Sequence, residues 1–169
     1  YGVDYVRELQ RMAVEETRLG IPLIFGYDVI HGHRTIFPIS LGEAASWDTA
    51  AVRRAARIAA IEATAEGLNW TFAPMVDIAR DPRWGRISEG AGEDTYLGMA
   101  MAKARVKGFQ DNDLSSPYTM MACAKHYAAY GAAQAGRDYN TVDVSDRTLR
   151  EVYLPPFKAC VDQGVATFM

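Results

Sequence analysis

The feature that most constrains this chain is a set of four short, nearly continuous apolar runs that recur at almost equal intervals. The runs begin at residues 21, 70, 120 and 165, so that successive starts lie 49, 50 and 45 residues apart. None of them alternates apolar with polar residues, and such a run is typical of a strand that is covered on both faces. We therefore expect strands of a mostly parallel sheet over 21–28, 70–76, 120–126 and 165–169.

Helical patterns occupy the intervals between these runs. Asp48 can cap a helix that ends before Gly67, and Ser145 can open another that Pro155 and Pro156 interrupt or restart. The apolar positions repeat every three or four residues, as on the buried face of a helix. The predicted buried faces are Val6, Leu9, Met12 and Ala13 in a helix over 4–19 that Gly20 stops, Val52, Ala55, Ala56, Ala59 and Ala63 after Asp48, Leu97, Ala100, Met101 and Ala104 up to about Gly108, and Leu149, Val152 and Tyr153 after Ser145.

Alternation of strands and helices predicts an α/β fold with a parallel sheet. The surplus residues of each unit follow the strand (29–47, 77–92 and 127–144), where a (β/α)8 barrel carries its catalytic loops. Eight such units would need roughly 400 residues, against about 250 in a minimal barrel. The 169 residues therefore predict a partial (β/α)8 TIM-like barrel, roughly the first four strands with long βα loops. A complete doubly wound domain is the alternative, although a Gly-rich phosphate turn after the first strand is missing.

Composition and charge exclude several classes of function. Lys and Arg number 18 against 21 Asp and Glu, a net charge of −3, which argues against a nucleic-acid partner. No apolar run reaches the ~18 residues of a membrane span, so we expect no membrane partner. Cys123 and Cys160 are too few for a disulfide framework, and we expect buried free thiols rather than a disulfide. The start at Tyr1 and the end directly after an apolar run lead us to expect a piece of a longer protein.

Polar residues follow the first three predicted strands, and the carboxyl ends of parallel strands meet at one rim. Asp28 ends the first run, Asp77 follows the second, and Lys125 and His126 end the third. The loop at 81–86 adds two arginines and a tryptophan. Carboxylates and cations form charge-assisted hydrogen bonds with hydroxyl groups, and an aromatic face can cover a sugar ring. The pattern favours a carbohydrate over a nucleotide as ligand.

Structural roles stay open for these residues. The loop at 81–86 is also a good turn sequence in which Trp84 would be a plug, and Asp28 could simply cap a turn. Lys125 lies in an otherwise apolar run, so it needs either a ligand or a buried acidic partner.

Neither a metal nor a phosphate cofactor is expected. His31 and His33 lack further ligands at metal-site spacing, and hydrogen-bonded loop histidines are the favoured interpretation. The glycines at 90–92 form too short a run, with acidic flanks, for a phosphate loop. Asp94 belongs to an acidic helix start, whereas Glu89 lies nearer the loop and could face the rim.

Longer stretches of the sequence resemble glycoside hydrolase family 3 in the order and spacing of their motifs. The likeness runs from Tyr5 to Met169, and the motifs that carry it are 25–33, 37–38, 72–74, 80–86, 93–96, 125–131, 136–140 and 154–157. The loop after the Lys-His pair lacks the compact Asp-His motif of the family's β-N-acetylglucosaminidases. This difference favours the family's β-glucosidase branch.

The resemblance implies a (β/α)8-like N-terminal barrel, of which residues 1–169 would be an incomplete first part, followed by an α/β sandwich domain and often a fibronectin-like domain. It implies retaining exo-hydrolysis of terminal β-D-glucosyl residues from β-glucosides, without a cofactor, by a periplasmic or secreted enzyme. Carried over by position, the substrate-binding residues would be Asp28, Arg86, Lys125 and His126, with Arg83, Trp84 and Glu89 as possible supporting residues.

The same resemblance places the catalytic residues outside this chain. The family's nucleophile is an aspartate in a Ser-Asp motif at a later strand, and its acid/base is usually a glutamate of the second domain. The Ser-Asp at 145–146 falls at a predicted helix start, so Asp146 is not assigned as the nucleophile. We expect residues 1–169 alone to be inactive and poorly soluble without the rest of the polypeptide. A non-catalytic carbohydrate-binding half-barrel and a β-xylosidase or other family 3 exo-glycosidase are the alternatives.

Overall fold

A computed structural model describes residues 2–169; Tyr1, which the predicted domain includes, lies outside the described residues. The described residues form four short strands and a larger share of helix, and the predicted α/β class is confirmed. Two pairs of strands, β1 with β2 and β3 with β4, are each parallel. The strands are β1 (Gly26–Tyr27), β2 (Trp70–Thr71), β3 (Cys123–Ala124) and β4 (Thr167–Phe168).

Two further parallel bridges join these pairs into one arrangement. One links Trp70 to Met121, and the other links Met75 to Lys125. The strands therefore lie in the order β1-β2-β3-β4, which is the order of the chain. A doubly wound domain reverses its strand order at a switch point, and no reversal occurs within residues 2–169. The observed order is the one that consecutive β/α units of a singly wound fold produce.

The regular pairing is much shorter than predicted. Between the two bridges, residues 70–75 on the β2 side lie opposite residues 121–125 on the β3 side. The β2 side thus has one residue more, as in a β-bulge. Pro74 lies in this stretch and has no N–H to offer a neighbouring strand. The N–H of Cys123 instead bonds to the carbonyl oxygen of Ala73 at 2.8 Å. Uninterrupted strands over 70–76 and 120–126 are therefore a wrong prediction, because the ladder loses its register inside them.

The outer two runs also differ from the prediction. Residues 21–25 form no strand, and Ile21 and Ile24 are exposed. The run at 165–169 is exposed or half-buried, whereas residues 122–125 are fully buried. Since β1 and β4 are the edges of the described sheet, each has a neighbouring strand on one side only. Burial on both faces, predicted for all four runs, is therefore wrong for the two outer runs, whose residues are largely exposed or half-buried.

The helices begin where their caps predict. The side chains of Asp48, Asp94 and Ser145 each accept a backbone N–H three residues further on, at 2.8, 2.7 and 3.1 Å. Pro155 opens the last helix, where its missing N–H is harmless. The helices are α1 (Val3–Arg11), α2 (Ser40–Ala45), α3 (Thr49–Ala65), α4 (Thr95–Gln110), α5 (Asp146–Thr148) and α6 (Pro155–Asp162), with short 3-10 or π segments η1 (Met12–Glu16), η2 (Gly85–Glu89), η3 (Tyr130–Ala132), η4 (Gln134–Gly136) and η5 (Leu149–Tyr153).

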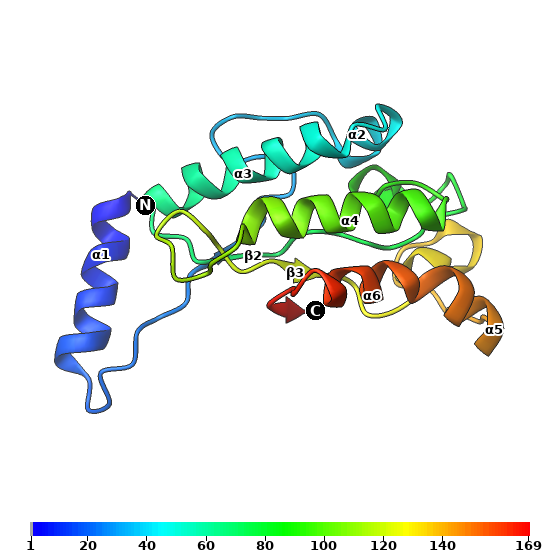
Figure 1. Ribbon diagram of the computed structural model, residues 1–169. Helices are drawn as coiled ribbons and strands as arrows, with labels where there is room; N and C mark the ends of the chain where they lie inside the picture. The colour runs from blue at the N-terminus through cyan, green and yellow to red at the C-terminus, as the bar shows by residue number, and fades with distance from the viewer. Residues whose placement is uncertain (1) are drawn as a thin grey trace.

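Three helices, α3, α4 and α6, lie side by side along the sheet (Figure 1). One core forms between them and the strands, and its helical part consists largely of small residues. The predicted buried face of α3 is confirmed at Val52, Ala56 and Ala63. Gly108 of α4 allows the closest approach, because a Cβ there would lie 2.5 Å from the Cβ of Ala56. Small side chains thus set the spacing of α3 and α4 and hold the sheet that carries the site.

The first helix is a further correction. α1 stands apart from the other helices (Figure 1), and the helical segment ends at Glu16 rather than at Gly20. Of residues 3–16 only Ala13 is buried, and Met12 is 42% exposed. The apolar stripe of this segment therefore has little to pack against among the described residues, so periodicity alone overestimated its burial.

Cys123 and Cys160 are buried free thiols, as predicted. Burial raises the pKa of the Cys160 thiol to about 12, so the reactive thiolate is suppressed. Within residues 2–169, no helix combines the length and the apolar character that a bilayer crossing requires.

Candidate functional site

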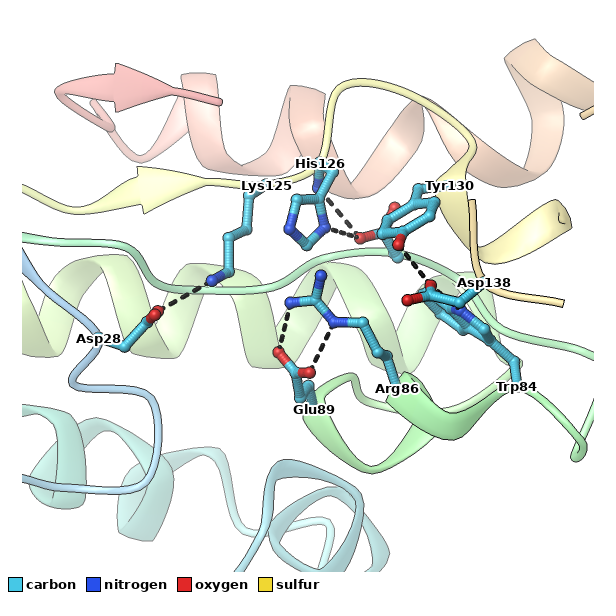
Figure 2. A network of polar contacts seen from close by, with 9 residues as sticks. Asp28, Trp84, Arg86, Glu89, Lys125, His126, Tyr130 and Asp138 are labelled. Atoms are coloured by element: carbon cyan, nitrogen blue, oxygen red, sulfur yellow. Dashed lines mark hydrogen bonds and ion pairs between the residues drawn. The ribbon is translucent and has the colours of Figure 1, made fainter. Parts of the chain in front are cut away.

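The polar residues that follow the first three strands gather at the carboxyl end of the sheet. Asp28 comes directly after β1, and Lys125 and His126 come directly after β3. Figure 2 shows them close to Arg86, which η2 supplies from the loop after β2. Asp77, from the same loop, also bonds to His126. The chain thus brings residues that lie up to about a hundred positions apart to one rim, as parallel β/α units do.

Lys125 and Asp28 form the first pair of the site. The Lys125 Nζ donates to Asp28 Oδ1 at 2.9 Å. The lysine side chain is 5% exposed, whereas that of Asp28 is 58% exposed. The acidic partner that a lysine in an apolar run requires is therefore itself a predicted site residue. An ammonium has three donors and a carboxylate several acceptor positions, so the pair retains both functions for a ligand.

His126 and Asp77 form the second pair. The imidazole Nδ1 lies 2.9 Å from Asp77 Oδ2, and the backbone N–H of His126 donates to the same oxygen at 3.0 Å. The Asp77 side chain is fully buried, and that of His126 is 22% exposed. The ring is therefore held from below by a buried carboxylate, and its other nitrogen is left for the rim.

Arg86 and Glu89 form the third pair, within η2. Two parallel hydrogen bonds of 2.7 and 2.8 Å connect the guanidinium and the carboxylate. The hydrogen bond from Arg86 lowers the pKa of Glu89 against the opposing effect of burial, and the charges of Lys125 and His126 lower it further. Glu89 is thus an ionised neighbour of the cations at the rim, and it fixes the plane of the Arg86 side chain.

Aromatic residues support this group from one side. Asp138 accepts hydrogen bonds from the Trp84 indole N–H at 2.9 Å and from the Tyr130 hydroxyl. The Tyr130 ring lies between Arg86, whose guanidinium carbon is 5.7 Å from the ring centroid, and His126, whose ring centroid is 5.0 Å away. Burial and the bond to Asp138 raise the pKa of Tyr130 to about 12, so its hydroxyl remains a donor.

The structure brings most of the predicted site residues together but not all of them. Trp84 is 1% exposed and serves as a plug beneath the rim, the structural role left open above. Arg83 instead forms a separate ion pair with Asp81 at 2.7 Å and has a largely exposed side chain. Tyr130 and Asp138 received no role from the sequence, since nothing local marks them beyond the motifs in which they lie.

The histidines at 31 and 33 behave differently from each other. His33 has the expected hydrogen bond, from Nε2 to Glu66 Oε2 at 3.0 Å. The Nδ1 of His31 is buried and has no partner among the described residues, and burial lowers the pKa of this histidine. No group of three or more His, Cys, Asp or Glu side chains within residues 2–169 is arranged to hold a metal ion.

Fold and site together define a class: parallel β/α units that present paired carboxylates and cations at the carboxyl ends of their strands. Such a rim suits a ligand rich in hydroxyl groups. A family profile described as "Glycosyl hydrolase family 3 N terminal domain" matches residues 2–169, and the chain belongs to this family. The resemblance seen in the sequence motifs is thereby confirmed.

Individual relatives refine this assignment. The chain is 51% identical over 164 residues to the periplasmic β-glucosidase of Salmonella typhimurium. The matched residues make up 97% of this chain and 21% of that protein. A β-glucosidase from Listeria innocua, solved with glucose and, as a mutant, with laminaribiose, has a TM-score of 0.95 and 45% identity over 99% of this chain and 24% of that one. A putative β-xylosidase of Formosa agariphila is 36% identical over 169 residues, covering 96% of this chain and 22% of that protein. The chain therefore spans about a fifth to a quarter of these relatives.

Proposed function

We propose that residues 1–169 are the first part of a (β/α)8 barrel domain in a longer, retaining β-glucosidase, and that they form the floor of its glucose-binding pocket. One observation carries the proposal: three carboxylates, each hydrogen-bonded to a lysine, a histidine or an arginine, meet at one rim that three successive β/α units form. The relatives that share this segment and are named β-glucosidases, one of them solved with glucose, support the substrate class. The pairs are Lys125–Asp28 at 2.9 Å, His126–Asp77 at 2.9 Å and Arg86–Glu89 at 2.7 Å.

Each site residue has a defined part in this proposal. Asp28 accepts hydrogen bonds from hydroxyl groups of the terminal glucosyl residue, since its side chain is more exposed than that of its partner Lys125. Lys125 and Arg86 donate, each with hydrogens left over from its acidic partner. His126 contributes the nitrogen that does not face Asp77. The segment supplies no nucleophile and no acid/base, which a retaining glycosidase needs as two carboxyl groups about 5–5.5 Å apart.

The remaining barrel strands and a second domain then complete the pocket. An apolar groove of about 750 Å³ lies beside β4, at the open edge of the sheet, where a further strand and helix would pack. Apolar side chains dominate its lining, among them Tyr127, Leu154, Phe157, Val161 and Phe168. We place the whole enzyme in the periplasm or outside the cell, a location supported by the name of the Salmonella relative.

Kinetics of the full-length enzyme test the binding roles. Asp28→Ala and Arg86→Ala should each lower kcat/KM for an aryl β-glucoside by about 10²-fold, because each removes a charged contact to a substrate hydroxyl. Near-normal kcat/KM in both variants would reduce these residues to structural ones.

The isolated segment tests whether residues 1–169 bind substrate but lack the catalytic residues. Residues 1–169, purified alone, should show no turnover of the same glucoside. Turnover that disappears in Asp146→Asn would overturn both the expected inactivity and the exclusion of Asp146 as nucleophile. Tight glucose binding by the segment in calorimetry would favour the alternative of a non-catalytic carbohydrate-binding half-barrel.

A β-xylosidase is the second candidate, since the Formosa agariphila relative has that name. The two activities differ in one group, the hydroxymethyl substituent of glucose that xylose lacks. Comparison of kcat/KM for aryl β-glucoside and aryl β-xyloside separates them. A larger value for the xyloside would replace the β-glucosidase proposal.

A further inference from the structure

Asp77 is the most deeply buried acid near the rim, and within residues 2–169 its side-chain hydrogen bonds go to a single residue. Its side chain has no exposed surface. One oxygen, Oδ2, receives both the backbone N–H of His126 at 3.0 Å and the imidazole Nδ1 at 2.9 Å. The carboxylate therefore fixes the main chain and the ring of the same histidine at once.

This double contact determines the form of the imidazole. A carboxylate has acceptor positions only, so the hydrogen of the bond between Oδ2 and the ring must be carried by Nδ1. In neutral His126 the lone pair then lies on Nε2, the nitrogen turned away from Asp77. The Tyr130 ring packs edge-to-face on the imidazole, with centroids 5.0 Å apart, and restricts its rotation further. The ring is thus oriented from two sides.

The other oxygen of Asp77 lies in the layer beneath the rim. Oδ1 is buried and has no hydrogen-bond partner among residues 2–169. A cavity of about 10 Å³ has Ser40, Asp77 and Arg105 among its lining residues. This volume is about that of a single water molecule's probe sphere, and the Ser40 hydroxyl and the Arg105 guanidinium offer polar partners.

We propose that Asp77 is a positioning residue that holds His126 in the Nδ1–H form and so makes Nε2 an acceptor for one hydroxyl of the sugar. The inference rests on the proposed function in one respect, namely that His126 contacts the substrate. Asp77 itself touches no substrate, because its side chain is fully buried beneath the ring. Its effect on the reaction passes entirely through His126.

A double-mutant cycle in the full-length enzyme tests the coupling of these residues. His126→Ala should lower kcat/KM for an aryl β-glucoside by about 10- to 100-fold, the loss of one oriented hydrogen bond. Asp77→Ala should cause a loss of similar size in the wild-type background and almost none in the His126→Ala background. Asp77→Leu, which removes the acceptor but fills the volume, replaces Asp77→Ala if that variant fails to fold.

Two controls separate positioning from simple stabilisation. Asp94→Ala removes a carboxylate that lies outside the rim and caps α4, and its effect on kcat/KM should be equal in the wild-type and His126→Ala backgrounds. Asp77→Asn keeps an oxygen that can accept from Nδ1, and it should recover most of kcat/KM.

The outcomes distinguish this inference from the proposed function. If His126→Ala has normal kcat/KM, the contact between His126 and the sugar is wrong. If His126→Ala is impaired but Asp77→Ala lowers kcat/KM equally in both backgrounds, Asp77 acts through stability and the positioning role is overturned. Asp77→Asn with as large a loss as Asp77→Ala would also contradict it.

Discussion

Replacement of Lys125 with methionine removes the most deeply buried cation of the rim without opening a hole. The methionine side chain has a similar length, and the lysine it replaces is only 5% exposed. The substitution deletes the ammonium that donates to Asp28 at 2.9 Å, and with it the donor that we assign to a glucose hydroxyl. We expect kcat/KM of the full-length enzyme for an aryl β-glucoside to fall by about 10²- to 10³-fold.

Two losses produce this magnitude. A hydrogen bond from a charged group to a substrate hydroxyl contributes about 1.5–3 kcal/mol. The second loss is the orientation of Asp28, which solvent screens because this side chain is 58% exposed, so about 1 kcal/mol or less is added. Because Lys125 is buried, we take the first loss at the upper end of its range. The sum is then about 3–4 kcal/mol, which corresponds to a factor of about 10²–10³, since 1.4 kcal/mol changes a rate by about tenfold.

The assay is initial-rate kinetics with a chromogenic β-glucoside, alongside thermal unfolding of each variant. Lys103→Met is the matched control, because Lys103 is exposed on α4 and belongs to no part of the rim. The control should keep wild-type kcat/KM. A Lys125→Met enzyme that unfolds at the wild-type temperature and stays within about tenfold of wild-type kcat/KM would refute the reasoning.

Two further predictions concern stability. Gly108→Ala should lower the free energy of unfolding by about 1–3 kcal/mol, because the new Cβ would lie 2.5 Å from the Cβ of Ala56. Gly85→Ala is the control, since a Cβ at that position has no atom within 4 Å. Equal Tm values for the two variants would contradict the packing argument. The pKa of Glu89 lies below the ordinary 4.5 because of Arg86, so its stabilising effect is present above pH 4.5 and disappears as the pH falls through the lowered value. In Glu89→Gln, Tm should therefore fall less steeply than in the wild type as the pH is lowered below about 4.5. Curves of Tm against pH that run parallel for the two proteins would disprove this.

Helices were the most predictable part of the fold. Caps such as Asp48 and Ser145 and the stripe on α3 act over three or four residues, so the sequence pattern contains nearly all the relevant information. The α1 segment was predicted less well, because periodicity shows which face is apolar but not whether anything lies opposite it. Its neighbours belong to the tertiary arrangement, which leaves it apart from α3, α4 and α6.

Strand limits were harder to predict for a related reason. The apolar run over 70–76 marked the right place in the chain, yet its pairing loses register near Pro74. A proline that has no N–H is visible in the sequence, but the bulge depends on how Ala73 and Cys123 meet across the sheet. The exposed stretch at 21–25 likewise depends on its place at a sheet edge, which no local pattern encodes.

The candidate site shows the same division. Strand-end positions identified Asp28, Lys125 and His126, because charged residues beside apolar runs stand out in one dimension. The partners of these residues did not stand out. Tyr130 begins the short 3-10 segment η3 and Asp138 lies in the loop after η4, and their role in the site comes from contacts with Trp84 and Arg86 that only folding creates.

The sequence by itself determined the alternation of elements, the starts of the helices and the membership in glycosyl hydrolase family 3, since each of these is recorded in short-range patterns and motifs. The tertiary structure decided which charges pair. Lys125 and Asp28 are 97 residues apart in the chain, and His126 and Asp77 are 49 apart. Their contacts arise because parallel strands bring their carboxyl ends to one rim, and the distances along that rim depend on packing between helices rather than on separation along the chain.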